Sequence, residues 1–298
     1  MINKNFKLNA IDPSITMTSE KTNSDFAIVC TALVKEVGKP FSEFATQVLA
    51  HMNTLPNECL LWILPEYAMR DADPQEMMDF IHTQLMPVMP KELTIILGTI
   101  EFTLNGRYTN NAIIIHDQNI WYRPKTKTLE SETHNGLESG NNAGVIKLPF
   151  FNLGVLVCAD LWDNKMVKKM VTQGADILAV PSWTATVDAQ TALEDFSSLA
   201  RTESTGKSVI VAVCDHFQAP PKSKFQVAGA TQIRSPDGRG YISSRQPVFQ
   251  SVAFLNLDMV NKARTQWRKK GLAQSYFFSH VDAAPKTVDD KNQQSPEV

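Results

Sequence analysis

The sequence lacks the features that mark secreted scaffolds, zinc proteins and membrane proteins. It has only four cysteines in 298 residues, and they lie far apart in mostly apolar stretches. This spacing fits neither a disulfide-dense scaffold nor a zinc site. No apolar run approaches the ~18–20 residues of a membrane span, and no basic-then-apolar signal peptide opens the sequence. We therefore expect a protein of the reducing cytoplasm.

An excess of charge of either sign is also missing, since the formal net charge is −2. Such a chain has no overall basic field that would attract nucleic acid or anionic lipid. One dense basic cluster, residues 264–270, is short and typical of a solvated helix face. The six histidines are scattered without metal-ligand spacing. We expect no nucleic-acid or membrane partner, no metal, no cofactor and no catalytic histidine.

Apolar residues are plentiful enough for a large core, because 43% of the sequence is hydrophobic. A chain of this length can bury about three quarters of its unfolded surface. Residues 1–24 and 282–298 are polar and weakly patterned, so we expect an N-terminal arm and a disordered C-terminal tail. The body between them, residues 25–281, is predicted to be a single domain, because layered α/β enzymes often exceed 200 residues as one unit.

Short apolar runs alternate with longer helical patterns along this body. Runs of four to eight residues that are rich in β-branched side chains and bounded by turn signals are typical of buried strands. Asn105-Gly106 and the stretch 235–238 are interpreted as hairpin turns. This pattern predicts an α/β fold, a sandwich of two mixed sheets with outer helices. The expected strands are 26–33, 59–64, 93–100, 111–116, 120–123, 144–148, 153–158, 177–181, 208–214, 227–234 and 252–257, and the expected helices are 41–52, 75–86, 165–173 and 191–205.

A cysteine at the end of a buried strand is the first candidate for chemistry. Cys158 closes the apolar run 153–158, and a helix is expected to begin near Asp163. Backbone N–H groups and a helix N-terminus near such a strand end lower a thiol pKa and can hold an oxyanion. On this segment alone, however, Cys158 is better explained as a small core residue, because free cysteine is among the most buried residue types.

Two charged residues also follow predicted strands. Glu66 comes directly after the strand 59–64, and Lys125 follows the strand 120–123 and a proline that fixes the local backbone. Each has an ordinary explanation by itself, Glu66 as a turn or helix-capping residue and Lys125 as part of a charged loop. Together with Cys158, they place three reactive groups at three strand ends in the order Glu, Lys, Cys.

This order and the motifs around it resemble the nitrilase superfamily, also called carbon–nitrogen hydrolases, over nearly the whole body. The resemblance rests on many pieces in the right order, because no single piece is specific. It implies a four-layer αββα sandwich with a Glu–Lys–Cys active site. The matching pieces are Leu64-Pro65-Glu66-Tyr67, the stretch 122–132, the Gly-Val-Leu-Val-Cys-Ala-Asp stretch 154–160, the stretches 174–178 and 180–183, the helix 199–206 and the late hairpin 235–239.

The resemblance carries roles onto particular residues of this chain. Glu66 is the implied base, Lys125 the implied stabiliser of the oxyanion, and Cys158 the implied nucleophile that forms a thioester. The family also has a second active-site glutamate in the loop after the lysine. Glu132 is the best candidate for it, with Glu138 as the alternative.

Residues next to these three are expected to complete the site. The backbone N–H of Ala159 is predicted to help hold the oxyanion, and Tyr67 and Trp183 to line the acyl pocket. Trp183 is explained equally well as a large core residue. Asp160 and Trp162 are expected to orient the turn that carries the nucleophile.

The residue after the nucleophile bears on the substrate. Members of the family that act on true nitriles commonly have tryptophan where this chain has Ala159, so we expect hydrolysis of a small-molecule amide or carbamoyl compound by water. Two alternatives stay open: a nitrilase or soluble acyltransferase of the same family, and a non-catalytic binding member. The resemblance also implies a homodimer or a larger homo-oligomer.

Overall fold

The computed structural model describes residues 9–10, 25–141, 144–184, 209–216, 231–234, 240–243, 249–258, 261–262 and 265. The strands are β1 (Asn9–Ala10), β2 (Phe26–Thr31), β3 (Cys59–Ile63), β4 (Thr94–Leu104), β5 (Arg107–His116), β6 (Asn119–Pro124), β7 (Val145–Lys147), β8 (Asn152–Val155), β9 (Ile177–Pro181), β10 (Ile210–Cys214), β11 (Gln232–Arg234), β12 (Gly240–Ser243) and β13 (Gln250–Leu255). The helices are α1 (Phe41–Met52), α2 (Pro74–Phe80), the π-helical turn η1 (Ile81–Leu85), α3 (Glu130–His134), the 3-10 helix η2 (Cys158–Trp162) and α4 (Asn164–Thr172).

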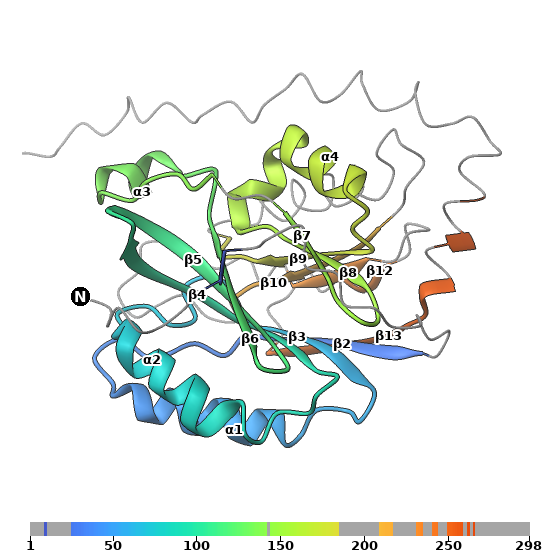
Figure 1. Ribbon diagram of the computed structural model, residues 1–298, viewed down its shortest axis with the longest axis horizontal. Coiled ribbons are helices and arrows are strands. Elements are labelled where there is room, and N and C mark those ends of the chain that lie inside the picture. The colour runs from blue at the N-terminus through green and yellow to red at the C-terminus, as the bar shows by residue number, and fades with distance from the viewer. Residues whose placement is uncertain are drawn as a thin grey trace, which may run out of the picture.

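Two β-sheets stack on each other, with α1 and α2 outside one sheet and α4 outside the other (Figure 1). The strand order of the first sheet is β1-β6-β5-β4-β3-β2-β13, and that of the second is β12-β11-β10-β9-β8-β7. Both sheets contain parallel and antiparallel pairs. The predicted α/β sandwich of two mixed sheets with outer helices is therefore confirmed.

Strand directions decide which residues meet at one end of the sandwich. In the first sheet β3 and β4 are parallel, and two antiparallel hairpin steps from β4 through β5 return β6 to the direction of β3. In the second sheet β8, β9 and β10 are all parallel. Residues that follow parallel strands emerge at the same edge of the sheet. The segments after β3 and β6 on one sheet, and after β8, β9 and β10 on the other, are thus gathered in space.

The core explains why the strands appear as unbroken apolar runs. In β2, Phe26, Ile28 and Cys30 pack toward the second sheet, while Ala27 and Val29 pack toward α1 and α2. A strand that is buried on both faces needs apolar side chains at every position rather than at alternate ones. The strands at the centre of the sandwich were therefore detectable from composition alone.

Local signals are confirmed where they are strong. The predicted helix 41–52 coincides with α1, whose buried side chains recur at the spacing of one helix face. Asn105 and Gly106 have φ values of 51° and 80°, as a type I′ turn between antiparallel strands requires. The helix near Asp163 begins as expected, because the Asp163 carboxylate accepts the N–H of Lys165 at 2.9 Å and caps α4.

The structure differs from the sequence-based prediction in several elements. The strand predicted for 153–158 ends at Val155, and Cys158 instead opens η2. The five-residue helix α3 and the strand β12 were not predicted. Within the predicted N-terminal arm, β1 pairs in parallel with β6 and so joins the first sheet.

Several predictions lie outside the described residues. These are the helix 191–205, the turn 235–238 and the tail 282–298, and the single-domain boundaries 25–281 stay a prediction. Among the helices in the described ranges, none combines the length and apolar character needed to cross a membrane.

Candidate active site

Glu66 follows Leu64 and Pro65 after the end of β3, in a tight turn that β4 holds in place. The next residue, Tyr67, has a φ of 56°, which non-glycine residues rarely adopt, and its N–H donates to Thr99 Oγ1 at 2.7 Å. Gly98 allows this close approach, because a Cβ at that position would lie 2.4 Å from the carbonyl oxygen of Pro65. The turn therefore directs a carboxylate that is only 1% exposed into the interior.

Lys125 is held on both sides of its backbone at the end of β6. Its N–H donates to the carbonyl of Asn110 at 2.8 Å, and its carbonyl accepts the N–H of Gly140 at 2.7 Å. The Nζ atom lies 2.8 Å from Glu66 Oε1 and 2.6 Å from Glu132 Oε1. Burial alone would lower the pKa of Lys125, but the acidic groups around it, Glu66 first, raise it above its usual value. The buried ammonium therefore stays charged.

The Glu66 carboxylate joins the two sheets. Besides the Lys125 ammonium, its Oε1 accepts a hydrogen bond from Asn110 Nδ2 at 3.0 Å. Its Oε2 accepts the backbone N–H of Trp183, which follows β9 of the second sheet, at 3.1 Å. Burial raises the pKa of Glu66, and the positive charge of Lys125 opposes that rise. The result is a carboxylate with more affinity for a proton than an ordinary glutamate has.

Cys158 is the first residue of η2 and has a strained backbone at the turn that follows β8. Its φ of 45° is unusual for a residue with a side chain and costs roughly 1–3 kcal/mol. The Asp160 carboxylate holds the turn, because it accepts the N–H of Val157 at 3.1 Å, of Thr126 at 2.8 Å and of Lys127 at 2.7 Å. Asp160 therefore ties the turn of the cysteine to the loop of the lysine. The prediction that Asp160 orients this turn is confirmed.

The Cys158 thiol contacts both sheets. Its Sγ lies 3.7 Å from the carbonyl oxygen of Trp183 and close enough to the Glu66 carboxylate for the two groups to shift each other's pKa. Burial raises the pKa of the thiol, the negative charge of Glu66 raises it further, and Lys125 lowers it. Both groups therefore hold a proton more tightly than they would in water.

Glu132 is the second glutamate of the cluster. Its Oε1 accepts hydrogen bonds from the Lys125 ammonium and, at 2.7 Å, from the Tyr67 hydroxyl. Its other oxygen accepts the backbone N–H at the start of α3. Glu138, the alternative candidate, is 51% exposed and lies 4.0 Å from Arg107 at the surface. The structure thus brings Glu132, and not Glu138, to the lysine.

Aromatic rings flank the cluster. The rings of Tyr67 and Trp183 meet edge to face at 5.5 Å between centroids, and the ring of His216 lies 5.6 Å from that of Trp183. The Nε2 atom of His216 contacts the backbone carbonyl of Glu66. Burial lowers the pKa of His216 to about 4, so its ring is neutral at ordinary pH.

The sequence predicted no catalytic histidine, and no motif in it gave a sign that His216 would lie beside the cluster. His216 belongs to no pair of histidines with metal-ligand spacing in the sequence. The useful signal was its place just past the end of β10, which it shares with the residues that follow β3, β6 and β8.

Ala159 lies in the first turn of η2. Backbone N–H groups in a first helical turn have no acceptor within the helix, so this one can serve a ligand. The site therefore offers a fixed ammonium and a backbone donor beside one thiol.

The other three cysteines lie elsewhere, and within the described part of the chain none of them has both a carboxylate and an ammonium beside it. Cys30 and Cys214 are in the core between the sheets, and Cys59 is in the core beneath α1 and α2. Burial raises the pKa of Cys59 to about 12, so this thiol stays protonated. Across the described ranges, no group of three histidine, cysteine or acidic side chains is arranged to hold a metal ion.

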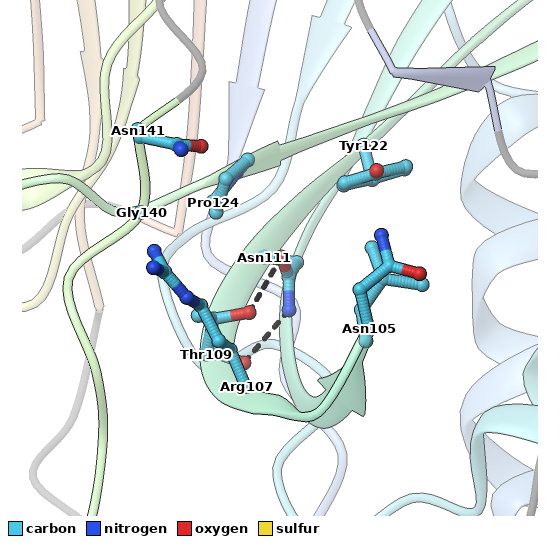
Figure 2. A pocket seen from close by; sticks show the side chains of 9 residues that line it. Asn105, Arg107, Thr109, Asn111, Tyr122, Pro124, Gly140 and Asn141 are labelled. Atoms are coloured by element: carbon cyan, nitrogen blue, oxygen red, sulfur yellow. Dashed lines mark hydrogen bonds between the residues drawn. The ribbon is translucent and has the colours of Figure 1, made fainter.

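A hollow of about 380 Å³ lies on the face of β5 that points away from the cluster of Glu66, Lys125 and Cys158 (Figure 2). Asn110 points toward Glu66, while its neighbours Thr109 and Asn111 line the hollow and hydrogen-bond to each other. Because successive strand residues point to opposite faces, the sheet itself separates this hollow from the buried cluster.

The fold and the cluster together define the class of protein. A two-sheet αββα sandwich with buried Glu, Lys and Cys side chains gathered at facing strand ends is the arrangement of the nitrilase superfamily. A family model described as carbon-nitrogen hydrolase matches residues 42–246. The chain belongs to the carbon–nitrogen hydrolase family, and it is a hydrolase of carbon–nitrogen bonds. Among curated proteins, no significant sequence match is found.

Solved structures share this fold at low identity. Nit3 of Saccharomyces cerevisiae, a member of branch 10 of the nitrilase superfamily, aligns with a TM-score of 0.69 at 17% identity, over 84% of this chain and 97% of that one. The carbon-nitrogen hydrolase of Helicobacter pylori G27 gives 0.66 at 15%, over 86% and 98%. A mutant of the amidase from Nesterenkonia sp. AN1, in complex with butyramide, gives 0.62 at 15%, over 84% and 98%.

Proposed function

We propose that this chain hydrolyses a small carboxamide or carbamoyl compound, with Cys158 as nucleophile, Glu66 as base and Lys125 as stabiliser of the oxyanion. The observation that carries the proposal is the Glu66 carboxylate, which lies 2.8 Å from the Lys125 ammonium and accepts the backbone N–H of Trp183, whose carbonyl oxygen lies 3.7 Å from the Cys158 sulfur. All three side chains are buried. A purely structural core gains little from such a set, because each buried charge carries a large desolvation cost.

The first half of the reaction forms a thioester. Glu66 takes the proton of the Cys158 thiol, and the sulfur attacks the carbonyl carbon of the substrate. Negative charge develops on the carbonyl oxygen, where the Lys125 ammonium and the N–H of Ala159 donate hydrogen bonds. The protonated Glu66 then gives its proton to the leaving nitrogen, the carbon–nitrogen bond breaks, and ammonia or an amine departs.

The second half returns the enzyme to its starting state. Glu66 takes a proton from water, and the oxygen attacks the thioester carbon. The carbon–sulfur bond breaks, the proton on Glu66 returns to sulfur, and a carboxylic acid leaves. One group can serve as base and then as acid only if its pKa lies closer to neutrality than that of a free glutamate, and burial shifts Glu66 in that direction.

Glu132 acts through the lysine. Its 2.6 Å contact with Nζ, together with the hydrogen bond from Tyr67, fixes where the ammonium points. We assign it as a positioning residue for Lys125, with Tyr67 and Trp183 as walls of the acyl pocket.

Ammonia release from a panel of small amides and carbamoyl compounds tests this function. Butyramide, the ligand of the Nesterenkonia amidase mutant, is a natural first member of the panel. We expect turnover by the wild type, none by Cys158→Ala, and turnover close to wild type by the control Cys59→Ala, whose sulfur lies in the core beneath α1 and α2. Ammonia release by folded Cys158→Ala at the wild-type rate, or none by the wild type from any panel member, would contradict the proposal.

A further inference from the structure

Arg70 places a positive charge at the outer side of the proposed acyl pocket. It follows the tight turn after β3, where its N–H donates to the carbonyl of Tyr67 at 3.1 Å. Its guanidinium carbon lies 5.8 Å from the centroid of the Tyr67 ring and 5.9 Å from that of the Trp183 ring. Two aromatic faces at this distance attract a cation and limit where its head group can go.

The two rings connect this cation to the buried cluster. The hydroxyl of Tyr67 donates to Glu132, and the backbone of Trp183 contacts both Glu66 and Cys158. Arg70 itself is exposed, whereas the cluster is buried. The guanidinium therefore lies on the solvent side of the aromatic walls, and the reacting groups lie on the inner side.

No acid in the described part of the chain forms an ion pair with Arg70. Among the described residues, no carboxylate lies within salt-bridge distance of its guanidinium. Glu101, an acidic group on the adjacent strand, instead accepts a hydrogen bond from Tyr108 at 3.0 Å. The field of Arg70 also reaches the inner wall: burial lowers the pKa of His216 most, and the charge of Arg70 lowers it further.

A planar guanidinium with free donors recognises a carboxylate through two parallel hydrogen bonds. The inner cluster holds two glutamates against one lysine, so an anionic substrate needs a compensating cation outside it. We propose that Arg70 is a specificity-determining residue that receives a substrate carboxylate, so that the substrates are short amido acids with a carboxamide or carbamoyl group at one end and a carboxylate at the other. This inference rests on the proposed function of the same site.

A matched pair of amides tests the proposal. Succinamic acid and butyramide have the same length and differ only in a carboxylate against a methyl group. We expect the wild type to have the higher kcat/KM for succinamic acid. Arg70→Gln should lower the ratio of the two kcat/KM values roughly tenfold to hundredfold, mainly through KM, and Arg70→Lys should retain part of the preference. A ratio in active Arg70→Gln within twofold of the wild-type ratio would overturn the assignment.

A control arginine separates a local effect from a loss of surface charge. Arg107 is also exposed, and its guanidinium faces Glu138 on the far side of β5 from the cluster. We expect Arg107→Gln to keep the wild-type ratio. If Arg107→Gln lowers the ratio of the two kcat/KM values as much as Arg70→Gln does, the effect reflects surface charge in general, and the assignment of Arg70 is overturned.

Binding distinguishes failure of this inference from failure of the proposed function. Calorimetric titration of Cys158→Ala with succinamic acid should show binding that weakens by a similar factor when Arg70→Gln is added. If neither amide is turned over but this dependence on Arg70 is seen, the carboxylate site stands and the hydrolytic proposal fails. Equal binding of succinamic acid and butyramide, or no binding of succinamic acid, overturns the role of Arg70.

Discussion

Two cysteines lie near the ends of parallel strands on either side of β9, and they have very different surroundings. Cys214 ends β10 and faces the interior, where its sulfur contacts the carbonyl of Thr31 at 3.5 Å. Burial raises the pKa of its thiol, and neighbouring Cys30 raises it further, so the group stays protonated. Cys158 is buried as well, but it lies in a strained turn beside a carboxylate and an ammonium.

The comparison shows that burial alone does not decide whether a thiol is inert. Both thiols are desolvated, and desolvation raises both pKa values. The two thiols differ in their neighbours. Cys158 has a carboxylate that can accept its proton and an ammonium that can stabilise the negative charge formed during the reaction. In this fold those two groups come from the other sheet, so only the cysteine at the facing edge receives them.

Removing the proton acceptor should have the largest effect on activity. Glu66→Gln keeps the size of the side chain but cannot take the thiol proton. In this variant Cys158, like Cys214, has no carboxylate to accept its proton. We expect kcat to fall by roughly 10²- to 10⁴-fold, measured as ammonia release from the best amide of the panel. An active enzyme with kcat within tenfold of wild type would remove Glu66 from the role of base.

Removing the cation should come next. Lys125→Met keeps the length of the side chain but leaves no ammonium at the oxyanion, and we expect kcat to fall about 100- to 1,000-fold. The variant also leaves two buried carboxylates without their partner, so its free energy of unfolding should fall by about 3–5 kcal/mol. Urea unfolding monitored by tryptophan fluorescence measures this loss, and unchanged stability would mean that one carboxylate is already protonated.

The turn that carries Cys158 should depend on Asp160. Asp160→Ala leaves three backbone N–H groups without their acceptor, and each costs about 1–3 kcal/mol when buried. Since the Val157 N–H is buried and those of Thr126 and Lys127 only partly, we expect the free energy of unfolding to drop by about 2–3 kcal/mol and activity to drop with it. The control is Asp163→Ala three residues on, which removes a helix cap worth about 1 kcal/mol. Equal losses in the two variants would contradict the role of Asp160.

The free energy of unfolding should depend on pH through His216, which lies just past Cys214 at the end of β10. Its pKa is about 4 in the folded protein and 6.5 as the ordinary value, so the unfolded chain binds the proton first as pH falls. Stability is therefore fully present above pH 6.5 and declines toward pH 4, by up to roughly 3 kcal/mol from this group. The free energy of unfolding, measured at a series of pH values, should decline less steeply toward low pH in His216→Gln than in the wild type. The same slope in both proteins would exclude this contribution.

The smallest effect belongs to Cys214 itself. Cys214→Ala removes one buried sulfur and creates a small cavity, so we expect a stability loss of about 1 kcal/mol or slightly more. Turnover should stay close to that of the wild type, because no reacting group contacts this thiol. Loss of activity in a well-folded Cys214→Ala protein would reverse the comparison between the two cysteines.

The sequence predicted the parts of the site that strand ends define. Buried strands are apolar on both faces, so their ends are sharp in the sequence, and Glu66, Lys125 and Cys158 each follow such an end. The fold class followed from the same runs. The exact end of β8 was missed, because an apolar residue in a turn looks the same as one in a strand.

Other parts of the site depend on contacts that no local pattern contains. Helix α3 is five residues long, too short for a periodic signal, so the choice between Glu132 and Glu138 needed the structure. The contact of His216 with Glu66 joins residues 150 positions apart across two sheets. No sequence pattern marks Arg70, because its place beside the rings of Tyr67 and Trp183 depends on the fold.

The most direct test of the central claim is the mass of the peptide that contains Cys158 after rapid acid quenching of the enzyme during turnover of butyramide. We predict an added butyryl group on Cys158, and none on the peptides that contain Cys30, Cys59 or Cys214. Turnover without any acyl group on Cys158, or an acyl group on another cysteine, would contradict the account.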